Sequence, residues 1–296
     1  MVDDLPLLAH ADVDWDGVRR STYVIRQSVR YQYRAPIYDL RQRLMLVPPS
    51  VHGDQRASAW GLDVSMETRR REWRDRFANR VVDLEVDVVD REIAFDMWSL
   101  IERRGNSGPH VVRPNPLWTV PTPLTTCDQV LSDAAAALAA GVSVEGTAAF
   151  GLAERICDWV YQHMSYRYDV TSIHTTAGEA LALGAGVCQD YAHIALALCR
   201  GCGLPARYVS GHLLGEGGSH AWIEVIVAHL DGTSRWQAIA LDPTHNRRVG
   251  LTYLTVANGR DYMDVAPMSG TCRTTMRGSL SVRKRADLVA VTYGGG

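Results

Sequence analysis

The hydrophobic pattern of the chain changes period at a proline-rich segment, and this change most restricts the folds open to its 296 residues. From Ser21 onward, before that segment, hydrophobic and polar residues alternate, which is typical of half-buried strands. Beyond it, the stretch from Glu145 to Met164 repeats its hydrophobic residues at the helical period. Four prolines between Arg113 and Thr125 forbid regular ladders there. The sequence therefore predicts an α+β protein that is divided at the prolines.

Four parts follow from this pattern. They are an acidic lead-in over residues 1–20, a mostly-β N-terminal domain over 21–112, a proline-rich linker over 113–125, and a core over 126–296 that carries the candidate catalytic residues. Helices are expected in the core over Leu131–Ala140, Glu145–Met164, Thr175–Leu183 and Cys188–Cys202. Strands are expected after Ala206, with a short tail strand near Leu280–Val282.

Charge and cysteine content exclude several classes of protein. The 31 basic and 33 acidic side chains nearly balance, so bulk electrostatics would not drive nucleic-acid binding. The first residues are acidic where a secretory signal would be basic, and no apolar run is long enough to span a membrane. Six cysteines in so long a chain do not form a disulfide scaffold. We expect a cytoplasmic protein without nucleic-acid or membrane partners.

Cys188 is the candidate nucleophile. It directly follows a turn that contains Gly184 and Gly186, and it opens a predicted helix. The N-terminus of a helix carries a partial positive charge and free N–H groups, which stabilise a thiolate and can hold an oxyanion. The alternative is a buried structural cysteine, because cysteine is among the most buried residue types.

A predicted hairpin supplies two partners for this thiol. His220 begins one strand, Asp242 ends the next, and Asp231-Gly232 between them is a turn signal. A three- or five-residue loop centred on Asp231 would place His220 directly opposite Asp242, whereas a two-residue loop would split them across the sheet. In the first register the carboxylate orients the imidazole, and the second ring nitrogen can face a thiol. Cys188, His220 and Asp242 would then act as nucleophile, base and orienting group.

Five segments of the core resemble the bacterial transglutaminase-like family. They are His174 to Ala177, Gly186 to His193 around Cys188, Pro205 to Gly211, Ser219 to Glu224, and Asp242 to Asn246. Gly259 to Val265 is similar to the C-terminal signature of this family, and the strand-rich start is similar to its N-terminal domain. The resemblance covers about residues 21–285. It implies a papain-like core in which a helix bearing Cys188 packs on an antiparallel sheet bearing His220 and Asp242.

The resemblance also implies thiol chemistry but leaves the substrate open. Cys188 would attack an amide, peptide or ester carbonyl, and the thioester would pass its acyl group to water or to an amine. Trp159, Tyr168, His174 and Gln189 are each candidates for a second oxyanion donor or a substrate contact, and Asp190 is a candidate for lining the site. The alternative function is a non-catalytic peptide-binding or scaffold module on the same fold.

Neither a metal nor an organic cofactor is expected. Cys199 and Cys202 form a CxxC pair, but no second CxxC or HxxxH pair completes a zinc site. Both cysteines continue a stripe of small side chains along the predicted helix, which favours close packing against a sheet.

Overall fold

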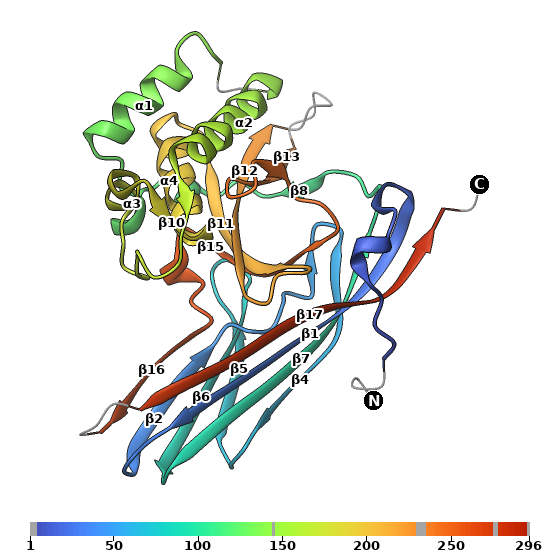
Figure 1. Ribbon diagram of the computed structural model, residues 1–296, viewed down its shortest axis with the longest axis vertical. Coiled ribbons are helices and arrows are strands. Elements are labelled where there is room, and N and C mark those ends of the chain that lie inside the picture. The colour runs from blue at the N-terminus through green and yellow to red at the C-terminus, as the bar shows by residue number, and fades with distance from the viewer. Residues whose placement is uncertain (1–4, 144–145, 229–234, 275–277, 295–296) are drawn as a thin grey trace.

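The computed structural model describes residues 5–143, 146–228, 235–274 and 278–294. Figure 1 shows two parts: helices and short strands gather at one end of the molecule, and long strands extend away from them. The mostly-β N-terminal region precedes a part in which one helix packs on an antiparallel sheet. The predicted α+β class is therefore confirmed.

The long strands form two antiparallel sheets over one shared hydrophobic core, here called the β-sandwich. One sheet has the order β17-β1-β7-β4-β3 and the other β16-β2-β6-β5. Alternation along β1 buries Tyr23, Ile25 and Val29, as the sequence predicts. The strands are β1 (Val18–Gln32), β2 (Ile37–Leu44), β3 (Val51–His52), β4 (Gln55–Val64), β5 (Arg69–Arg74), β6 (Arg80–Val89), β7 (Glu92–Arg104), β16 (Met268–Arg273) and β17 (Ser279–Tyr293).

The end of the chain returns to the β-sandwich. β17 pairs with β1 from end to end, and β16 pairs with β2. The sequence assigned these residues to the core at 126–296 and expected only a short tail strand. The first half of β17 is largely exposed, so it lacks the alternation that would mark a strand. Pairing with β17 satisfies backbone groups of β1 that would otherwise form an open sheet edge.

The remaining elements form the second part, here called the core. Its sheet has the order β14-β13-β12-β11-β15, and β8 pairs with the first residues of β13 on the same edge as β14. Helix α4 is almost wholly buried: it packs on β11 and β12 and is covered by the other three helices. The elements are β8 (His110–Val112), α1 (Gln129–Ala139), α2 (Gly146–His163), β9 (Ser165–Tyr166), α3 (Ala177–Leu183), β10 (Ala185–Gly186), α4 (Cys188–Gly201), β11 (Ala206–Leu213), β12 (His220–Ala228), β13 (Trp236–Asp242), β14 (Arg247–Arg248) and β15 (Tyr253–Gly259).

The proline-rich segment is bound to the core by one buried arginine. Residues 113–125 contain no strand and only two short 3-10 turns. Arg200 of α4 donates hydrogen bonds to the carbonyl of Trp118 and to the hydroxyl of Thr125 in this segment. It also donates to the carbonyls of Ala206 and Arg260. The guanidinium thus ties the segment to α4, to the start of β11 and to the loop after β15.

Two amide side chains of the β-sandwich attach it to the outer edge of β15. Gln55 donates to the carbonyl of Thr255 and accepts from its N–H, both at 2.8 Å. Asn79 donates to the carbonyl of Asn258 at 2.7 Å and accepts from its N–H at 2.8 Å. Each amide therefore replaces the partner strand that an edge strand lacks. The two parts are joined by directional hydrogen bonds as well as by apolar contact.

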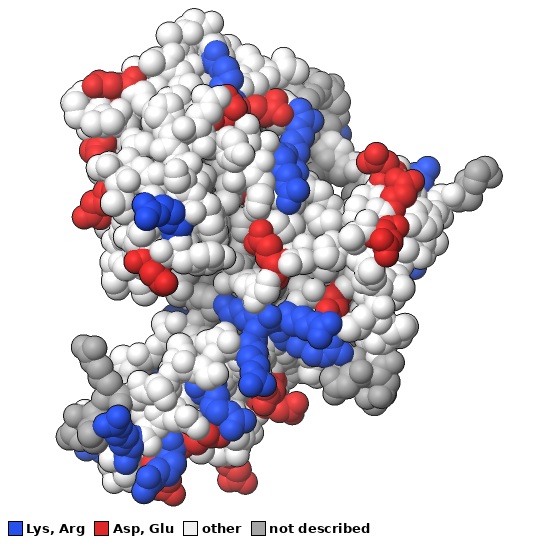
Figure 2. Space-filling model, viewed as in Figure 1, with Lys and Arg blue, Asp and Glu red and all other residues white. Residues whose placement is uncertain are grey.

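The surface carries both signs of charge. Figure 2 shows Lys and Arg side chains gathered at the junction of the two parts, with acidic and basic groups interspersed elsewhere on this face. Among the described residues, no helix has the length and apolar character needed to cross a membrane.

The place of β17 in the β-sandwich can be tested by a matched pair of substitutions. Leu288 is 1% exposed and Leu280, on the same strand, is 53% exposed. We expect Leu288→Ala to lower the free energy of unfolding by about 2–5 kcal/mol, because it opens a cavity in the shared core. Leu280→Ala should change it by less than about 0.5 kcal/mol. Urea unfolding followed by circular dichroism measures both, and equally small effects would contradict the placement of β17.

Candidate active site

Cys188 is the first residue of α4, and only Val187 separates it from the short strand β10. The helix start is capped by Asp190, whose carboxylate accepts the Val187 N–H at 2.8 Å and the Thr171 hydroxyl at 2.7 Å. A Cβ on Gly186 would lie 2.4 Å from an oxygen of Asp190, so only glycine fits there. The cap and the glycine together place the thiol at the positive end of the helix.

The hairpin that carries His220 and Asp242 has a different register from the one predicted. Ile223 lies opposite Leu241, so His220 is displaced by two residues from a position directly opposite Asp242. The described pairs, from Ile223–Leu241 to Ala228–Trp236, are centred one residue later in the chain than the predicted centre at Asp231. A displacement of two keeps both side chains on one face, and His220 Nε2 lies 2.8 Å from Asp242 Oδ2. The turn predicted at residues 231–232 lies outside the described residues.

The carboxylate of Asp242 is fully buried and receives four hydrogen bonds. The Thr244 N–H donates to Oδ1 at 2.9 Å, while Oδ2 accepts from the Tyr253 hydroxyl and from His245 Nδ1, each at 2.7 Å, in addition to His220. Burial alone would raise the pKa of Asp242, but the bonds to His220, His245 and Tyr253 hold it well below its usual value. Asp242 is therefore an anion with a fixed orientation.

The imidazole of His220 is only 2% exposed. Burial lowers its pKa, but the hydrogen bond to Asp242 and the adjacent Cys188 thiol outweigh burial and raise the pKa to about 10. Since Nε2 is bonded to Asp242, Nδ1 is the nitrogen left for the thiol. Among the described residues, no hydrogen bond reaches Nδ1. The structure thus places the Cys188 thiol beside His220 and bonds His220 to Asp242.

Glu216 adds a second carboxylate that the sequence did not single out. Its side-chain oxygens lie 3.4 Å from His220 Nδ1 and 3.4 Å from His245 Nε2. It belongs to the loop between β11 and β12, which is held from two sides. His212 donates to the carbonyl of Gly218, and the single lysine of the chain, Lys284 on β17, donates to the Ser219 hydroxyl, both at 3.1 Å.

A cavity of about 950 Å³ opens beside the three residues. One wall is aromatic and apolar, and the other consists of the Glu216 loop and the turn after Asp242. The lining residues are Tyr161, Met164, Tyr166, Tyr168, Tyr191, Glu216, Gly217, Gly218, Ser219, Thr244 and His245. Within the described part of the chain, all of them lie in the core and none in the β-sandwich. The β-sandwich reaches this wall through Lys284, which donates to the lining residue Ser219.

The other candidates from the sequence take different places. Tyr168 is 73% exposed and lines the cavity. The amide of Gln189 donates to the Ser172 carbonyl at 3.2 Å, and Asp190 caps α4. His174 is exposed, and the ring of Trp159 stacks on His163 with centroids 3.9 Å apart. The structure therefore directs only Tyr168 among the five toward the cavity.

Two groups of side chains among the described residues have the spacing needed to hold a metal ion. One is His220, Asp242 and His245 in the site itself, and the other is His52, His110 and Glu224 at the junction of the two parts. The CxxC pair belongs to neither group. Cys199 is fully buried in the apolar core, and Cys202 contacts the Ala135 carbonyl at 3.4 Å.

Two family models match this chain. Residues 136–242 match the transglutaminase-like superfamily, and residues 23–102 match the bacterial transglutaminase-like N-terminal region. A crystal structure from Cytophaga hutchinsonii, named a "putative cysteine protease", aligns over 93% of both chains with a TM-score of 0.73 and 20% sequence identity, which supports the fold. These matches confirm the resemblance seen in the sequence.

Curated relatives occur in mycobacteria. An uncharacterized protein of Mycobacterium tuberculosis is 37% identical over 132 residues, which cover 41% of this chain and 41% of that protein. One from Mycobacterium leprae is 38% identical over 122 residues, covering 38% of this chain and 41% of that protein. This chain thus spans about two-fifths of the length of the curated relatives that it matches.

The charge state of His220 can be measured by NMR of its imidazole nitrogens. With a pKa of about 10, His220 should stay cationic at pH 8, well above the ordinary histidine pKa of about 6.5. A pKa raised above 6.5 stabilises the folded protein fully below pH 6.5, and this contribution is lost as the pH rises through about 10. In Asp242→Asn the pKa should fall, because burial then dominates. A neutral His220 at pH 8 in the unaltered protein would contradict the pairing.

Proposed function

The chain belongs to the transglutaminase-like superfamily, and from this premise we propose that it is a thiol-dependent acyl-transfer enzyme acting on amide, peptide or ester carbonyls. The observation that carries the proposal is the placement of the Cys188 thiol at the start of α4 beside the buried His220 imidazole, whose Nε2 is bonded to Asp242. Each of the three groups has the surroundings that its role requires: a helix N-terminus, a buried imidazole and a fixed carboxylate.

The first half of the reaction forms a thioester. The Cys188 thiolate attacks the carbonyl carbon, and the resulting oxyanion is held by N–H groups at the start of α4. The imidazolium of His220 then donates its Nδ1 proton to the departing amine or alcohol as the bond to the carbonyl carbon breaks. Asp242 keeps the ring oriented and stabilises its positive charge before the proton is transferred.

The second half returns the enzyme to its first state. Water or an amine loses a proton to the now neutral His220 and attacks the thioester carbon. The C–S bond breaks, the acyl group leaves as an acid or a new amide, and Cys188 is again a thiolate beside an imidazolium. No metal or organic cofactor takes part in either half.

The cavity beside Cys188 and His220 is the proposed substrate site. Its tyrosine-rich wall suits the apolar and aromatic parts of a peptide or small amide. Glu216 on the opposite wall lies beside the nitrogen that exchanges protons with substrate, and it would attract an acceptor or donor with a positive charge.

All six cysteines are free thiols in the structure, which agrees with the proposed cytoplasmic location.

Activity can be tested with a panel of acyl donors. We expect the purified protein to release amine from amide, peptide or ester donors, and to transfer the acyl group when primary amines are added. Cys188→Ala should lower the rate by at least about 1,000-fold, since it removes the nucleophile. Cys272→Ala, which alters a partly exposed cysteine on β16, should retain the rate. Release that persists in Cys188→Ala would overturn the mechanism, and peptide binding without any turnover would support a non-catalytic module.

Thiol reactivity tests the pairing without knowledge of the substrate. Cys188 should react with iodoacetamide at pH 6 faster than Cys272, because only Cys188 has an imidazolium and a helix N-terminus to stabilise its thiolate. His220→Ala should abolish this advantage, and His163→Ala, which alters an exposed histidine, should not. Asp242→Asn should leave slower labelling, since the helix end remains. Mass spectrometry of the labelled peptides measures the rates, and equal rates at Cys188 and Cys272 would contradict the ion pair.

A further inference from the structure

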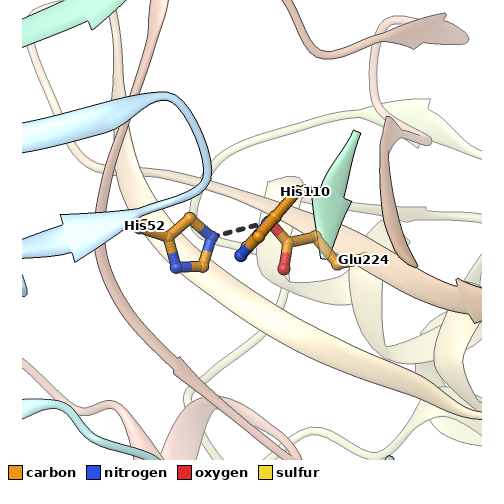
Figure 3. A group of neighbouring side chains, drawn as sticks. All are labelled: His52, His110 and Glu224. Atoms are coloured by element: carbon orange, nitrogen blue, oxygen red, sulfur yellow. Dashed lines mark hydrogen bonds and ion pairs between the residues drawn. The ribbon is translucent and has the colours of Figure 1, made fainter. Parts of the chain in front are cut away.

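Three side chains with metal-binding atoms meet at the junction of the β-sandwich and the core (Figure 3). His52 comes from β3, His110 from β8 and Glu224 from β12. His52 Nε2 lies 2.7 Å from Glu224 Oε1, His110 Nδ1 lies 3.9 Å from the same oxygen, and the ring centroids of the two histidines are 4.6 Å apart. Three separate segments thus direct one oxygen and two nitrogens toward a common point.

The surroundings hold these side chains in place. Gly53, in the turn after His52, has a φ of +57°, and a Cβ there would lie 3.1 Å from the His110 ring, so the turn packs directly on that imidazole. Arg207, on the neighbouring strand β11, donates to Glu224 Oε2 at 2.7 Å. The second carboxylate oxygen, Oε1, is therefore left for the two histidines. Glu224 is 3% exposed, and the side chains of His52 and His110 are 9% and 23% exposed.

His110 has no other polar role. Among the residues that the structure describes, neither of its ring nitrogens makes a hydrogen bond, although the ring packs against Gly53 and His52. If His110 served only to pack β8 against its neighbours, an apolar side chain would do as well. Instead, its Nδ1 faces the buried carboxylate of Glu224.

We propose that His52, His110 and Glu224 bind one divalent transition-metal ion, such as Zn²⁺, which links the β-sandwich to the core. Two imidazoles and one carboxylate are a donor set that such ions prefer. The ion takes the place of the proton between His52 Nε2 and Glu224 Oε1, and that proton is released to solvent. Arg207 orients the carboxylate, and the two nitrogen donors favour a transition-metal ion over Mg²⁺ and Ca²⁺, which prefer oxygen ligands.

The test is a Co²⁺ titration of chelator-treated protein that carries Cys188→Ala and His245→Asn. These changes remove the thiol and the second possible metal group, so cobalt bound at the junction can be observed alone. We expect one equivalent of Co²⁺ with d–d absorption and no thiolate-to-cobalt band, displaced by Zn²⁺ and not by Mg²⁺. Binding should raise the thermal midpoint, because the ion binds only the folded chain.

Single substitutions in that background decide the ligands. His52→Asn and His110→Asn should each weaken Co²⁺ binding by at least about tenfold, whereas His163→Asn, at an exposed histidine, should not weaken it. Circular dichroism identifies a variant that fails to fold. In that case the Co²⁺ affinity of the other histidine variant decides whether the proposed site binds the ion. Absence of saturable Co²⁺ binding in the parent protein, or binding in the folded histidine variants that equals that of the parent, would overturn the proposal. Because the protein used lacks Cys188, the result is independent of the proposed enzymatic function.

Discussion

The buried carboxylate of Asp242 is the group on which the rest of the site depends. A buried charge that loses its partners destabilises a protein by about 3–5 kcal/mol, so the hydrogen bonds to Asp242 must form together. One of them comes from Tyr253, whose own carbonyl accepts from Arg103 of the β-sandwich at 2.5 Å. Arg103 is in turn paired with Asp54 at 2.6 Å. The β-sandwich therefore helps to orient His220 through Tyr253, although it contributes nothing to the described cavity wall.

Strand β12 is fixed at its first residue and at its middle by charged or polar groups. At its start His220 is bonded to Asp242, and four residues later Glu224 is held by His52 and Arg207. Burial would raise the pKa of Glu224, but Arg207 and His52 hold it well below its usual value. The second anchor lies on the face toward the β-sandwich. A displacement of the two parts would thus disturb β12 at Glu224 and reach His220 along a rigid strand.

The local part of this arrangement was predictable from sequence, and the long-range part was not. Cys188 follows a glycine turn and opens a helix, and both features can be seen in the sequence. His220 begins one strand and Asp242 ends the next, and the strand pattern of the sequence indicates both positions. The hydrogen bond from Tyr253 to Asp242 depends on the tertiary structure, and no sequence pattern indicates it. Glu216 lies in a glycine-rich loop that has no hydrophobic periodicity, so the sequence does not show that it faces His220. β17 was underestimated because half of it is exposed on both faces. The hairpin register was predicted from a turn centred on Asp231, whereas the observed pairs are centred one residue later, a displacement that still leaves His220 and Asp242 on one face.

The two carboxylates near His220 have different physical roles because solvent screens only one of them. Asp242 is fully buried, so its charge acts on the imidazole at full strength and stabilises the imidazolium. Glu216 has a side chain that is 39% exposed, and water screens its charge. It nevertheless lies on the Nδ1 side, where a substrate must approach under the proposed mechanism. Asp242 would then set the protonation state of the base, and Glu216 would select which molecule reaches it.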